Sequence, residues 1–410
     1  MQTECAFGTH RTYTLAINDV SEIVRQLSRV GVGGWLVSDY AGSNPVLQYL
    51  LGRRLFLTRR AFLLISEEGA RLLVSRVDAV PEVRELPGCV VETYTSWVEL
   101  GDWLAAHVTP LRVVAMEYSP DGALPAMSRV DGGTLDLVHH LGVDVRSSAE
   151  LFQLAVGAWS ERNLASHRSA MRHAAEIMQL AFAFAGDRVH GGHVCTEHDV
   201  QSFILREFGK RGLISEDPPI VAANAHSGDP HYEPSPSGSA ELAARDWVLI
   251  DLWCRERSEQ AVFADITWVG FLGDQVPEEH RGVFDVVAGA RDGVVRVLRE
   301  RFAAGTPVLG FELDDVARRH IADAGMADRF VHRTGHSLGA DGSLHGLTAN
   351  LDDLETHDSR PIIDGVGFTV EPGIYLPSFG VRLEINVYMG ANGPEITSPV
   401  QEAPYLVPVG

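Results

Sequence analysis

The sequence is short of three features that would each point to a class of protein. Basic residues are few beside acidic ones, 34 Lys and Arg against 55 Asp and Glu, and the formal net charge of −21 argues against nucleic acid or an anionic membrane as a partner. No apolar run reaches about 18 residues, which argues against a transmembrane helix. The opening residues, MQTECAFGTHRTYTL, lack the basic start and apolar centre of a secretory signal peptide.

Cysteine is also scarce, and the four that occur are far apart, at Cys5, Cys89, Cys195 and Cys254. This spacing fits free or buried thiols in a reducing compartment better than a disulfide framework. The segment HVCTEH around Cys195 has no second ligand pair at zinc-finger spacing, so it does not predict a structural zinc site. We therefore expect a cytoplasmic protein.

What the chain does contain is an ordinary soluble composition over 410 residues, 45% hydrophobic and 22% charged. That length exceeds one ordinary core and predicts two domains. In the first domain, short strand-like and helix-like patterns alternate, which is typical of an α/β domain with a sheet covered by helices. Strands are predicted over 33–40, 61–67, 70–75 and 112–118, and helices over 19–31, 96–108 and 134–142.

A long helical stretch over 147–187 is predicted to bridge the two domains, 1–155 and 156–410. In the second domain, Thr196 and Asp199 resemble a capping box that opens another helix. Helices and antiparallel strand pairs then occupy separate runs, which indicates an α+β fold. Further helices are predicted over 197–212, 278–305 and 312–325, strands over 246–254 and 261–273, and two strands joined by a turn over 368–389.

Four acids interrupt the strands of the second domain, where aliphatic side chains are expected. Asp251 and Asp265 lie in two strands joined by a short polar segment, so a hairpin would bring both to one face. Glu371 and Glu384 lie in the strand pair near the C-terminus. Any one of these acids alone would be interpreted as a cap or a solvated strand end, but two such pairs in apolar strands indicate a site.

Convergence of these acids would require neutralisation. Two unit charges about 4 Å apart cost about 4 kcal/mol at an effective dielectric constant near 20, and several such pairs would exceed a typical stability of about 5–15 kcal/mol. Two divalent ions would balance four carboxylates, with His336 in the segment HRTGHSLG as a neutral ligand. Oxygen and imidazole ligands without thiolate suit manganese, cobalt, zinc or iron.

The second domain resembles the M24 metallopeptidases in three segments and in an ordered set of five ligands. The segments are HRTGHSLG, VEPGIY and GVRLE, and the ligands are Asp251, Asp265, His336, Glu371 and Glu384. The similarity is closest to the Xaa-Pro branch, which includes aminopeptidase P and prolidase. It implies an α+β pita-bread catalytic domain over 156–410, a creatinase-like α/β N-terminal domain over 1–155, and a homodimer. It also implies two divalent ions per chain, with manganese favoured over cobalt, zinc or iron.

The resemblance implies a role for each ligand. Asp265 and Glu384 would bridge both ions, Asp251 would complete one of them, and His336 with Glu371 would complete the other. A metal-bridging hydroxide would attack the peptide carbonyl, because a water between two ions has its pKa lowered towards 7. Glu371 would also move a proton from that water to the leaving nitrogen.

Five further residues resemble the substrate-handling groups of the Xaa-Pro branch. His231 would reach the peptide carbonyl or the scissile nitrogen, and His345 would stabilise the oxyanion. His332, Tyr375 and Arg382 would shape the far end of the site. Local structure is the alternative: His231 as a loop residue, Tyr375 as a core residue, and Arg382 as an ion-pair partner of Glu384.

The resemblance therefore implies a dinuclear metal-dependent hydrolase that cleaves Xaa-Pro bonds at the N-terminus of short proline-containing peptides. Tyr375 and one of Trp247, Trp253 and Trp268 would line the proline ring. A metal-dependent hydrolase of a small non-peptide amide or C–N bond is the alternative, because function depends on the site and not on the fold. A non-catalytic binding module on the same fold is a third interpretation, and the presence of all five ligands counts against it.

Overall fold

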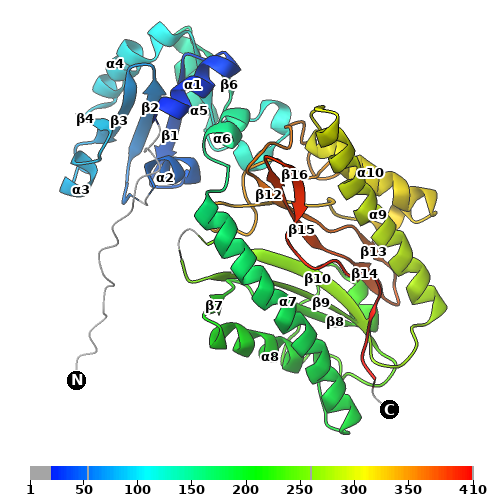
Figure 1. The fold of residues 1–410 in the computed structure, drawn as a ribbon. Helices are drawn as coiled ribbons and strands as arrows, with labels where there is room; N and C mark the ends of the chain where they lie inside the picture. The colour runs from blue at the N-terminus through cyan, green and yellow to red at the C-terminus, as the bar shows by residue number, and fades with distance from the viewer. Residues whose placement is uncertain (1–19, 53–54, 259–260, 409–410) are drawn as a thin grey trace, which may run out of the picture. The chain divides into compact units, whose positions relative to one another are not determined.

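The structure is a computed structural model that describes residues 20–52, 55–258 and 261–408 (Figure 1). The chain divides into two compact units, Met1–Val156 and Gly157–Gly410. The opening segment considered for a signal peptide, with Cys5, lies outside the described residues. The other three cysteines are free thiols. Among the described helices, none combines the length and the apolar composition that crossing a bilayer requires.

The N-terminal unit is built on a six-stranded sheet with the order β4-β3-β2-β1-β5-β6. β1 to β3 pair antiparallel, whereas β4, β5 and β6 join by parallel pairing. The strands are β1 (Gly34–Tyr40), β2 (Arg60–Ser66), β3 (Gly69–Ser75), β4 (Cys89–Tyr94), β5 (Val113–Met116) and β6 (Asp144–Ser147). The helices are α1 (Val20–Val30), α2 (Pro45–Leu51), α3 (Pro81–Arg84), α4 (Trp97–His107), α5 (Gly132–His140) and α6 (Ala149–Ala155).

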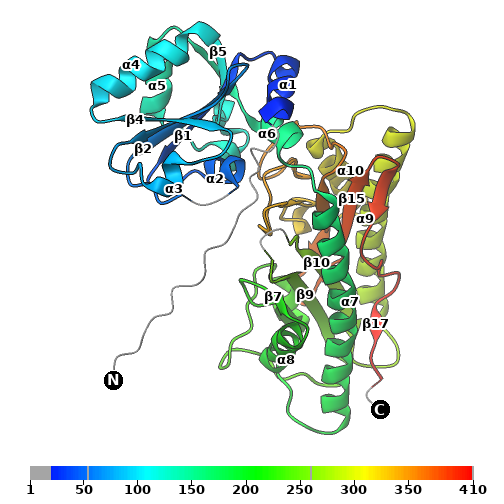
Figure 2. The ribbon, with the colours of Figure 1, turned by 60° about the vertical axis from the view of Figure 1, so that its left-hand side comes forward.

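Helices α4 and α5 cover this sheet through apolar side chains (Figure 2). Leu36 and Phe62 of the sheet belong to the same buried cluster as Leu104 of α4 and Val138 of α5. Gly69 closes the β2–β3 turn with φ of +104°, a conformation that glycine adopts without strain. The α/β fold predicted for this region is confirmed.

The helical stretch predicted over 147–187 is two helices rather than one. α6 ends at Ala155, and α7 (Glu161–His190) begins after Ser160. The Ser160 hydroxyl accepts from the backbone N–H of Asn163, and the Asn163 side chain accepts from the Ser160 N–H in return. This capping box starts a new helix. The prediction was wrong because helix-forming residues flank the stop on both sides. The boundary between the two units falls in the same break.

Two helix pairs enclose the strands of the C-terminal unit (Figures 1 and 2). α7 and α8 pack on one face of β9 and β10, and α9 and α10 belong to the cluster on the other face. One sheet has the order β17-β10-β9-β7 with β8 added to β9, and a second has the order β11-β12-β15-β16. The separate runs of helices and antiparallel strands confirm the α+β prediction.

The remaining elements agree with most of the predicted ranges to within a few residues. The helices are α8 (Glu197–Lys210), α9 (Glu278–Ala303) and α10 (Gly310–Asp323). The strands are β7 (Leu213–Ile214), β8 (Ile220–Ala223), β9 (Trp247–Glu256), β10 (Ala264–Phe271), β11 (Ser337–Leu338), β12 (Gly367–Val370), β13 (Gly373–Tyr375), β14 (Gly380–Arg382), β15 (Ile385–Gly390), β16 (Gly393–Ile396) and β17 (Tyr405–Leu406). A short 3-10 helix, η5 (Asn224–Gly228), follows β8.

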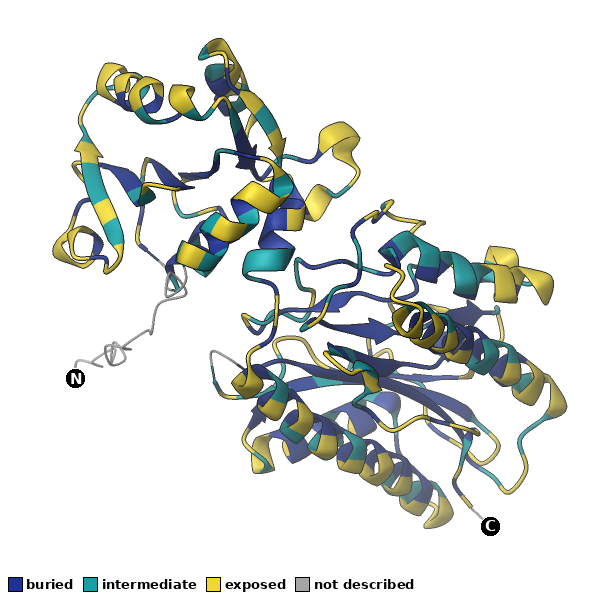
Figure 3. Ribbon diagram, turned by 45° about the horizontal axis from the view of Figure 1, so that its top comes forward, coloured by how far each residue is buried: buried dark blue, intermediate teal, exposed yellow. Residues whose placement is uncertain are grey.

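Strands β9 and β10 are buried on both faces (Figure 3), which explains their nearly continuous apolar sequences. Even-numbered residues such as Ile250 and Ile266 pack with α7 and α8. Odd-numbered residues such as Val269 pack with α9 and with the sheet that contains β12 and β15. Because side chains alternate along a strand, Asp251 and Asp265 belong to the odd-numbered face.

The segment 368–389 contains parts of four short strands rather than the two predicted. β12 pairs with β15 and β13 pairs with β14, so a small hairpin is inserted between the outer strands. The prediction was wrong because the apolar run continues through the change of pairing partner. Gly380 shows why the inserted hairpin needs glycine: a Cβ there would lie 1.9 Å from the carbonyl oxygen of Ser227 in η5.

The two halves of this unit share an order of elements, although the sequence shows no repeat. In each half a long helix precedes a 14-residue helix, α8 or α10. An isolated antiparallel bridge lies just before each short helix, Thr196↔Glu241 and Leu309↔Pro361. Asp251 lies ten residues after Glu241, and Glu371 lies ten residues after Pro361. The fold therefore places two of the predicted ligands at equivalent points.

One buried acid in the N-terminal unit makes all its side-chain hydrogen bonds to neutral partners. Glu117 is 0% exposed and follows β5. It accepts from Trp35 Nε1 at 2.7 Å, from Ser148 Oγ at 3.0 Å and from Asn44 Nδ2 at 3.0 Å. Burial raises the pKa of Glu117 to about 7, against the effect of these bonds. The carboxyl group thus ties together β1, the start of α2 and the start of α6.

We expect Glu117 to make the N-terminal unit less stable as the pH rises. The group titrates near 4.5 in the unfolded chain and near a pKa of about 7 in the folded one, so the folded state holds an extra proton between these values. The free energy of unfolding therefore falls across that window, by about 3 kcal/mol for a shift of this size. Urea unfolding of the wild type and Glu117→Gln at about pH 5 and about pH 8 measures the change. A difference between the two proteins that is the same at both pH values would contradict it.

Candidate metal centre

The hairpin predicted for Asp251 and Asp265 is confirmed. In the antiparallel β9–β10 pair, Asp251 lies opposite Thr267 and Asp265 lies opposite Trp253. The two acids are therefore diagonal neighbours on one face of the sheet. Both residues are buried, 8% and 4% exposed respectively, so neither is a solvated strand end.

Glu371 and Glu384 lie just beyond the end of the β12–β15 ladder. The last pair of that ladder is Val370↔Ile385, so the two glutamates are the next residues on their strands and lie opposite each other. The chain leaves the ladder at this point to form the β13–β14 hairpin. The Glu384 N–H donates to the carbonyl oxygen of Thr267 at 3.1 Å, which joins this corner to β10.

His336 comes from a third segment, immediately before β11. Thr369 holds its backbone twice: the His336 N–H donates to Thr369 Oγ1 at 2.9 Å, and the Thr369 N–H donates to the His336 carbonyl at 2.8 Å. His336 Nδ1 lies 3.2 Å from the carbonyl oxygen of Ser337. The other ring nitrogen, Nε2, therefore faces the acids, 3.4 Å from Asp265 Oδ2 and 3.5 Å from Glu371 Oε1.

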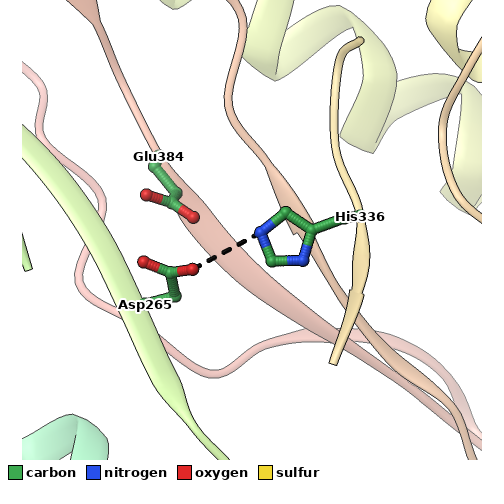
Figure 4. A group of neighbouring side chains, drawn as sticks. All are labelled: Asp265, His336 and Glu384. Atoms are coloured by element: carbon green, nitrogen blue, oxygen red, sulfur yellow. Dashed lines mark ion pairs between the residues drawn. The ribbon is translucent and has the colours of Figure 1, made fainter. Parts of the chain in front are cut away.

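Asp265, His336 and Glu384 form the tightest group of this kind among the described residues (Figure 4). One ligand atom from each lies within 4.8 Å of the other two, and all three residues are buried. Glu371 flanks this group beside His336. Asp251 is close enough for its charge to raise the pKa of both Asp265 and Glu384.

The centre is unfavourable for carboxylates without a cation. Burial raises the pKa of Asp265 and of Glu384 well above the usual range, and the neighbouring acids raise both further. Burial lowers the pKa of His336, which keeps the imidazole in the neutral form that binds metals. Two buried oxygens, Asp251 Oδ1 and Glu384 Oε1, have no hydrogen-bond partner within the described ranges. Four carboxylates, a neutral imidazole and these unpaired oxygens fit divalent cations.

Three of the predicted substrate-binding residues form a chain with one another, of which Tyr375 and Arg382 are buried and His332 is partly buried. Arg382 donates from Nη2 to Asp251 Oδ2 at 2.5 Å and from Nη1 to the Tyr375 hydroxyl at 2.8 Å. The Tyr375 hydroxyl lies 2.7 Å from His332 Nε2. His332 Nδ1 lies 2.7 Å from the carbonyl oxygen of Arg333, so Nδ1 carries the proton and Nε2 accepts from the tyrosine. The ion pair of Arg382 is thus with Asp251, and the pairing with Glu384 considered from the sequence was wrong.

Burial keeps this chain in one protonation state. Burial and the charge of Arg382 together lower the pKa of His332 to about 3. Burial also raises the pKa of Tyr375 to about 12. Both groups are therefore neutral around pH 7, and the guanidinium holds one oxygen of Asp251 while the other stays unpaired. The substrate roles of the three residues stay predictions.

The two predicted catalytic histidines are more exposed than the ligands. His345 lies against His336, with ring centroids 4.2 Å apart, and this neighbour lowers the pKa of His345 so that its ring is neutral. His231 lies in the loop that follows η5, where its backbone N–H donates to Asp229 Oδ1 at 3.0 Å. The structure therefore places His345 beside the predicted ligand His336. For His231, the described residues show only the backbone bond to Asp229, so its role at the centre stays a prediction.

Three residues that hold the ligands were not predicted: Thr267, Thr369 and Asn386. Thr267 Oγ1 donates to Glu384 Oε2 at 2.9 Å, and Thr369 Oγ1 donates to Glu371 Oε1 at 2.8 Å. Asn386 exchanges two hydrogen bonds, of 3.0 Å and 2.8 Å, with the backbone of Asp265. Each lies two residues from a ligand along its own strand or strand extension. The two-residue period of a strand was the signal that could have found them.

Comparison with known families agrees with this fold. The chain matches the metallopeptidase family M24 over residues 169–391, more than half of its length, and belongs to that family. An uncharacterised peptidase of Staphylococcus haemolyticus is 30% identical over 49% of this chain and 52% of its own length. An Xaa-Pro dipeptidase of Lactobacillus delbrueckii subsp. lactis is 28% identical over 52% of this chain and 53% of its own length. The chain thus matches about half the length of these curated relatives.

Solved structures share the fold over nearly the whole chain. The dipeptidase PepE from Mycobacterium ulcerans superposes with a TM-score of 0.71 and 21% identity, covering 96% of this chain and 98% of its own. An X-prolyl aminopeptidase from Caenorhabditis elegans, described as a cytosolic enzyme with a di-nuclear active site, has a TM-score of 0.68 and 14% identity. The match covers 95% of this chain and 63% of that protein. At these identities the likeness shows the fold.

We expect Asp265→Asn to lose most of the stabilisation that divalent metal gives the wild type. A cation that binds only the folded chain stabilises it by about 2.7 kcal/mol at a hundredfold excess over Kd. The substitution removes one of the charges that attract the cation, and Asp265 lies in the tight group. Thermal unfolding with and without Mn²⁺ measures the effect. Asp315→Asn, a partly exposed acid on α10 outside the centre, is the matched control and should respond as the wild type does. An undiminished response in Asp265→Asn would refute the assignment.

Proposed function

We propose that the protein is a dinuclear metallopeptidase that cleaves Xaa-Pro bonds at the N-terminus of short peptides. The observation that carries this proposal is the buried group of Asp265, His336 and Glu384, flanked by two further acids, with two buried carboxylate oxygens that no described residue pairs. Asp265 and Glu384 would bridge the two ions, with Asp251 completing one of them and His336 and Glu371 the other. When bound, the ions would supply Lewis acidity and lower the pKa of a coordinated water towards 7.

Glu371 would move the proton that the reaction must transfer. Its side chain is 16% exposed, more than those of Asp251 and Asp265, so it is the most accessible of these three carboxylates. Thr369 donates to Oε1 of Glu371 and fixes the direction of the carboxylate. A carboxylate held in this way can accept a proton from water and deliver it to the leaving nitrogen.

His345 and His231 would handle the peptide bond itself. His345 is neutral and lies beside a ligand, so its ring can donate a hydrogen bond to the oxygen on which negative charge develops. His231 is exposed and its ring is free to reach the carbonyl or the scissile nitrogen of a substrate. A preorganised donor of this type typically contributes about 10²–10³ in kcat.

The substrate class follows from what proline lacks. A proline nitrogen carries no hydrogen, so a site that accepts Xaa-Pro must hold the substrate through the free amine, the carbonyl and the ring. Of the three tryptophans considered from the sequence, Trp268 belongs to the cluster on the opposite face, and Trp247 is 0% exposed. Trp253 lies directly opposite Asp265 and is partly exposed, so it is the tryptophan we propose against the ring.

We further propose manganese as the metal, with cobalt, zinc or iron as alternatives, because the donors are oxygen and imidazole without thiolate. The three described cysteines are free, which suits a cytoplasmic enzyme. A homodimer is the proposed assembly, in keeping with the prevalence of two-fold oligomers among soluble enzymes.

The manganese-loaded protein should cleave Ala-Pro and Ala-Pro-Ala faster than Ala-Ala-Ala, by at least about tenfold in kcat/KM. The physical reason is that the site binds the ring and needs no hydrogen on the scissile nitrogen. Chromatography of the alanine released over time measures the rates. The metal-free protein is the control. Faster cleavage of Ala-Ala-Ala would contradict the proposal. Metal binding without cleavage of any peptide would favour a small-amide substrate instead.

A further inference from the structure

Glu197, the first residue of α8, is a fully buried carboxylate on which four donors converge. The Ala223 N–H donates to Oε1 at 2.6 Å, and the Ala240 N–H donates to Oε2 at 2.7 Å. The Tyr232 hydroxyl donates to Oε2 at 2.5 Å, and His226 Nδ1 lies 2.9 Å and 3.0 Å from the two oxygens. A buried anion is tolerated when its lone pairs are filled in this way.

All four donors belong to one segment, residues 223–240, which leaves β8 and returns to β9. Ala223 and Ala240 mark its two ends, while His226 and Tyr232 stack on each other inside it, with ring centroids 4.2 Å apart. Burial and the bond to Glu197 raise the pKa of Tyr232 to about 12, so the hydroxyl keeps the proton that it donates. One carboxylate therefore closes the whole segment into a loop, which we call the 223–240 loop.

Near its start, the 223–240 loop contacts the β13–β14 hairpin. Ser227 Oγ accepts from the Gly380 N–H at 2.8 Å, and a Cβ at Gly228 would lie 2.2 Å from the carbonyl oxygen of Leu376. These contacts seat η5 on the β13–β14 hairpin, which carries Tyr375. His231 is three residues beyond Gly228, a span of at most about 11 Å.

Few local contacts fix the position of the His231 side chain. Its ring is exposed, and its backbone N–H bonds only as far as Asp229. The next residue, Tyr232, is anchored on Glu197. The direction of the imidazole thus depends on a carboxylate that lies 34 positions earlier in the chain.

We propose that Glu197 is a positioning residue for the peptidase reaction: it holds the 223–240 loop so that His231 presents its ring to the scissile bond of the substrate. This inference rests on the proposed function, because it needs His231 to act on the substrate. Glu197 itself acts through the loop and touches no reacting atom.

The substitution Glu197→Gln tests the idea with little change of volume. An amide has one acceptor oxygen, so its NH₂ group must face donors that now have no partner. We expect kcat on Ala-Pro to fall by about 10- to 100-fold, as misplacement of a catalytic group does, with KM nearly unchanged. His231→Ala should lower kcat by about 100-fold or more. In the His231→Ala background, Glu197→Gln should then change kcat by less than about twofold, because the group that it positions is gone.

Two further variants keep the test decisive. Tyr232→Phe removes one of the four donors but keeps the ring stack, so it should fold and lower kcat by less than Glu197→Gln does, again only when His231 is present. Glu117→Gln removes a comparable buried carboxylate in the N-terminal unit, and should leave kcat unchanged within about twofold in both backgrounds.

The outcomes separate this inference from the proposed function. If Glu197→Gln and Tyr232→Phe lower kcat by the same factor with and without His231, the carboxylate does not act through that histidine and the inference fails. If both variants leave kcat at the wild-type value while His231→Ala lowers it, the inference also fails and the role of His231 stands. If the wild type cleaves no Xaa-Pro peptide when loaded with metal, it is the proposed function that fails.

Discussion

Four carboxylates lie close together in the C-terminal unit, and one guanidinium, that of Arg382, contacts one of them directly. The rest of this unit is arranged around the resulting excess of negative charge. Arg382 balances one of the four charges by binding Asp251. Of the other three, Asp265 and Glu384 are buried deeply enough that burial alone raises their pKa. Each remaining like-charge contact of about 4 Å costs about 4 kcal/mol, which a fold of ordinary stability bears only if protons or cations are bound. Divalent ions resolve the imbalance and use the oxygens left unpaired.

The structure supports its ligands with neutral hydrogen-bonding groups rather than with more cations. Thr267 and Thr369 direct individual carboxylate oxygens, and Asn386 clamps the backbone of β10. Buried acids of the short helices hold the loops around the centre. Glu197 on α8 fastens the loop with His231, and Asp314 on α10 accepts from the Thr334 N–H and hydroxyl in the segment that leads to His336. Neutral supports leave the negative charge of the ligands available for metal.

Much of this arrangement could be predicted from the sequence because the ligands lie in strands, where an acid interrupts a recognisable apolar pattern. Asp251 and Asp265 stood out in apolar runs, and the antiparallel hairpin that joins them is a local structure. The features that escaped depend on pairing between distant segments. The ion-pair partner of Arg382 was misjudged because β14 meets β9 only in the folded chain. The number of strands in 368–389 was misjudged because the hydrophobic pattern does not change where a strand changes its pairing partner. Glu197 escaped notice because its partners lie 26 to 43 residues away along the chain.

The central claim is that the buried acids are neutralised by metal. Elemental analysis of the full chain, reconstituted with Mn²⁺ and freed of unbound ions by gel filtration, tests this most directly. A dinuclear centre predicts about two ions per chain, removed by a chelator with a loss of thermal stability. Fewer than about one ion per chain, together with an unfolding temperature that the chelator does not change, would contradict the account.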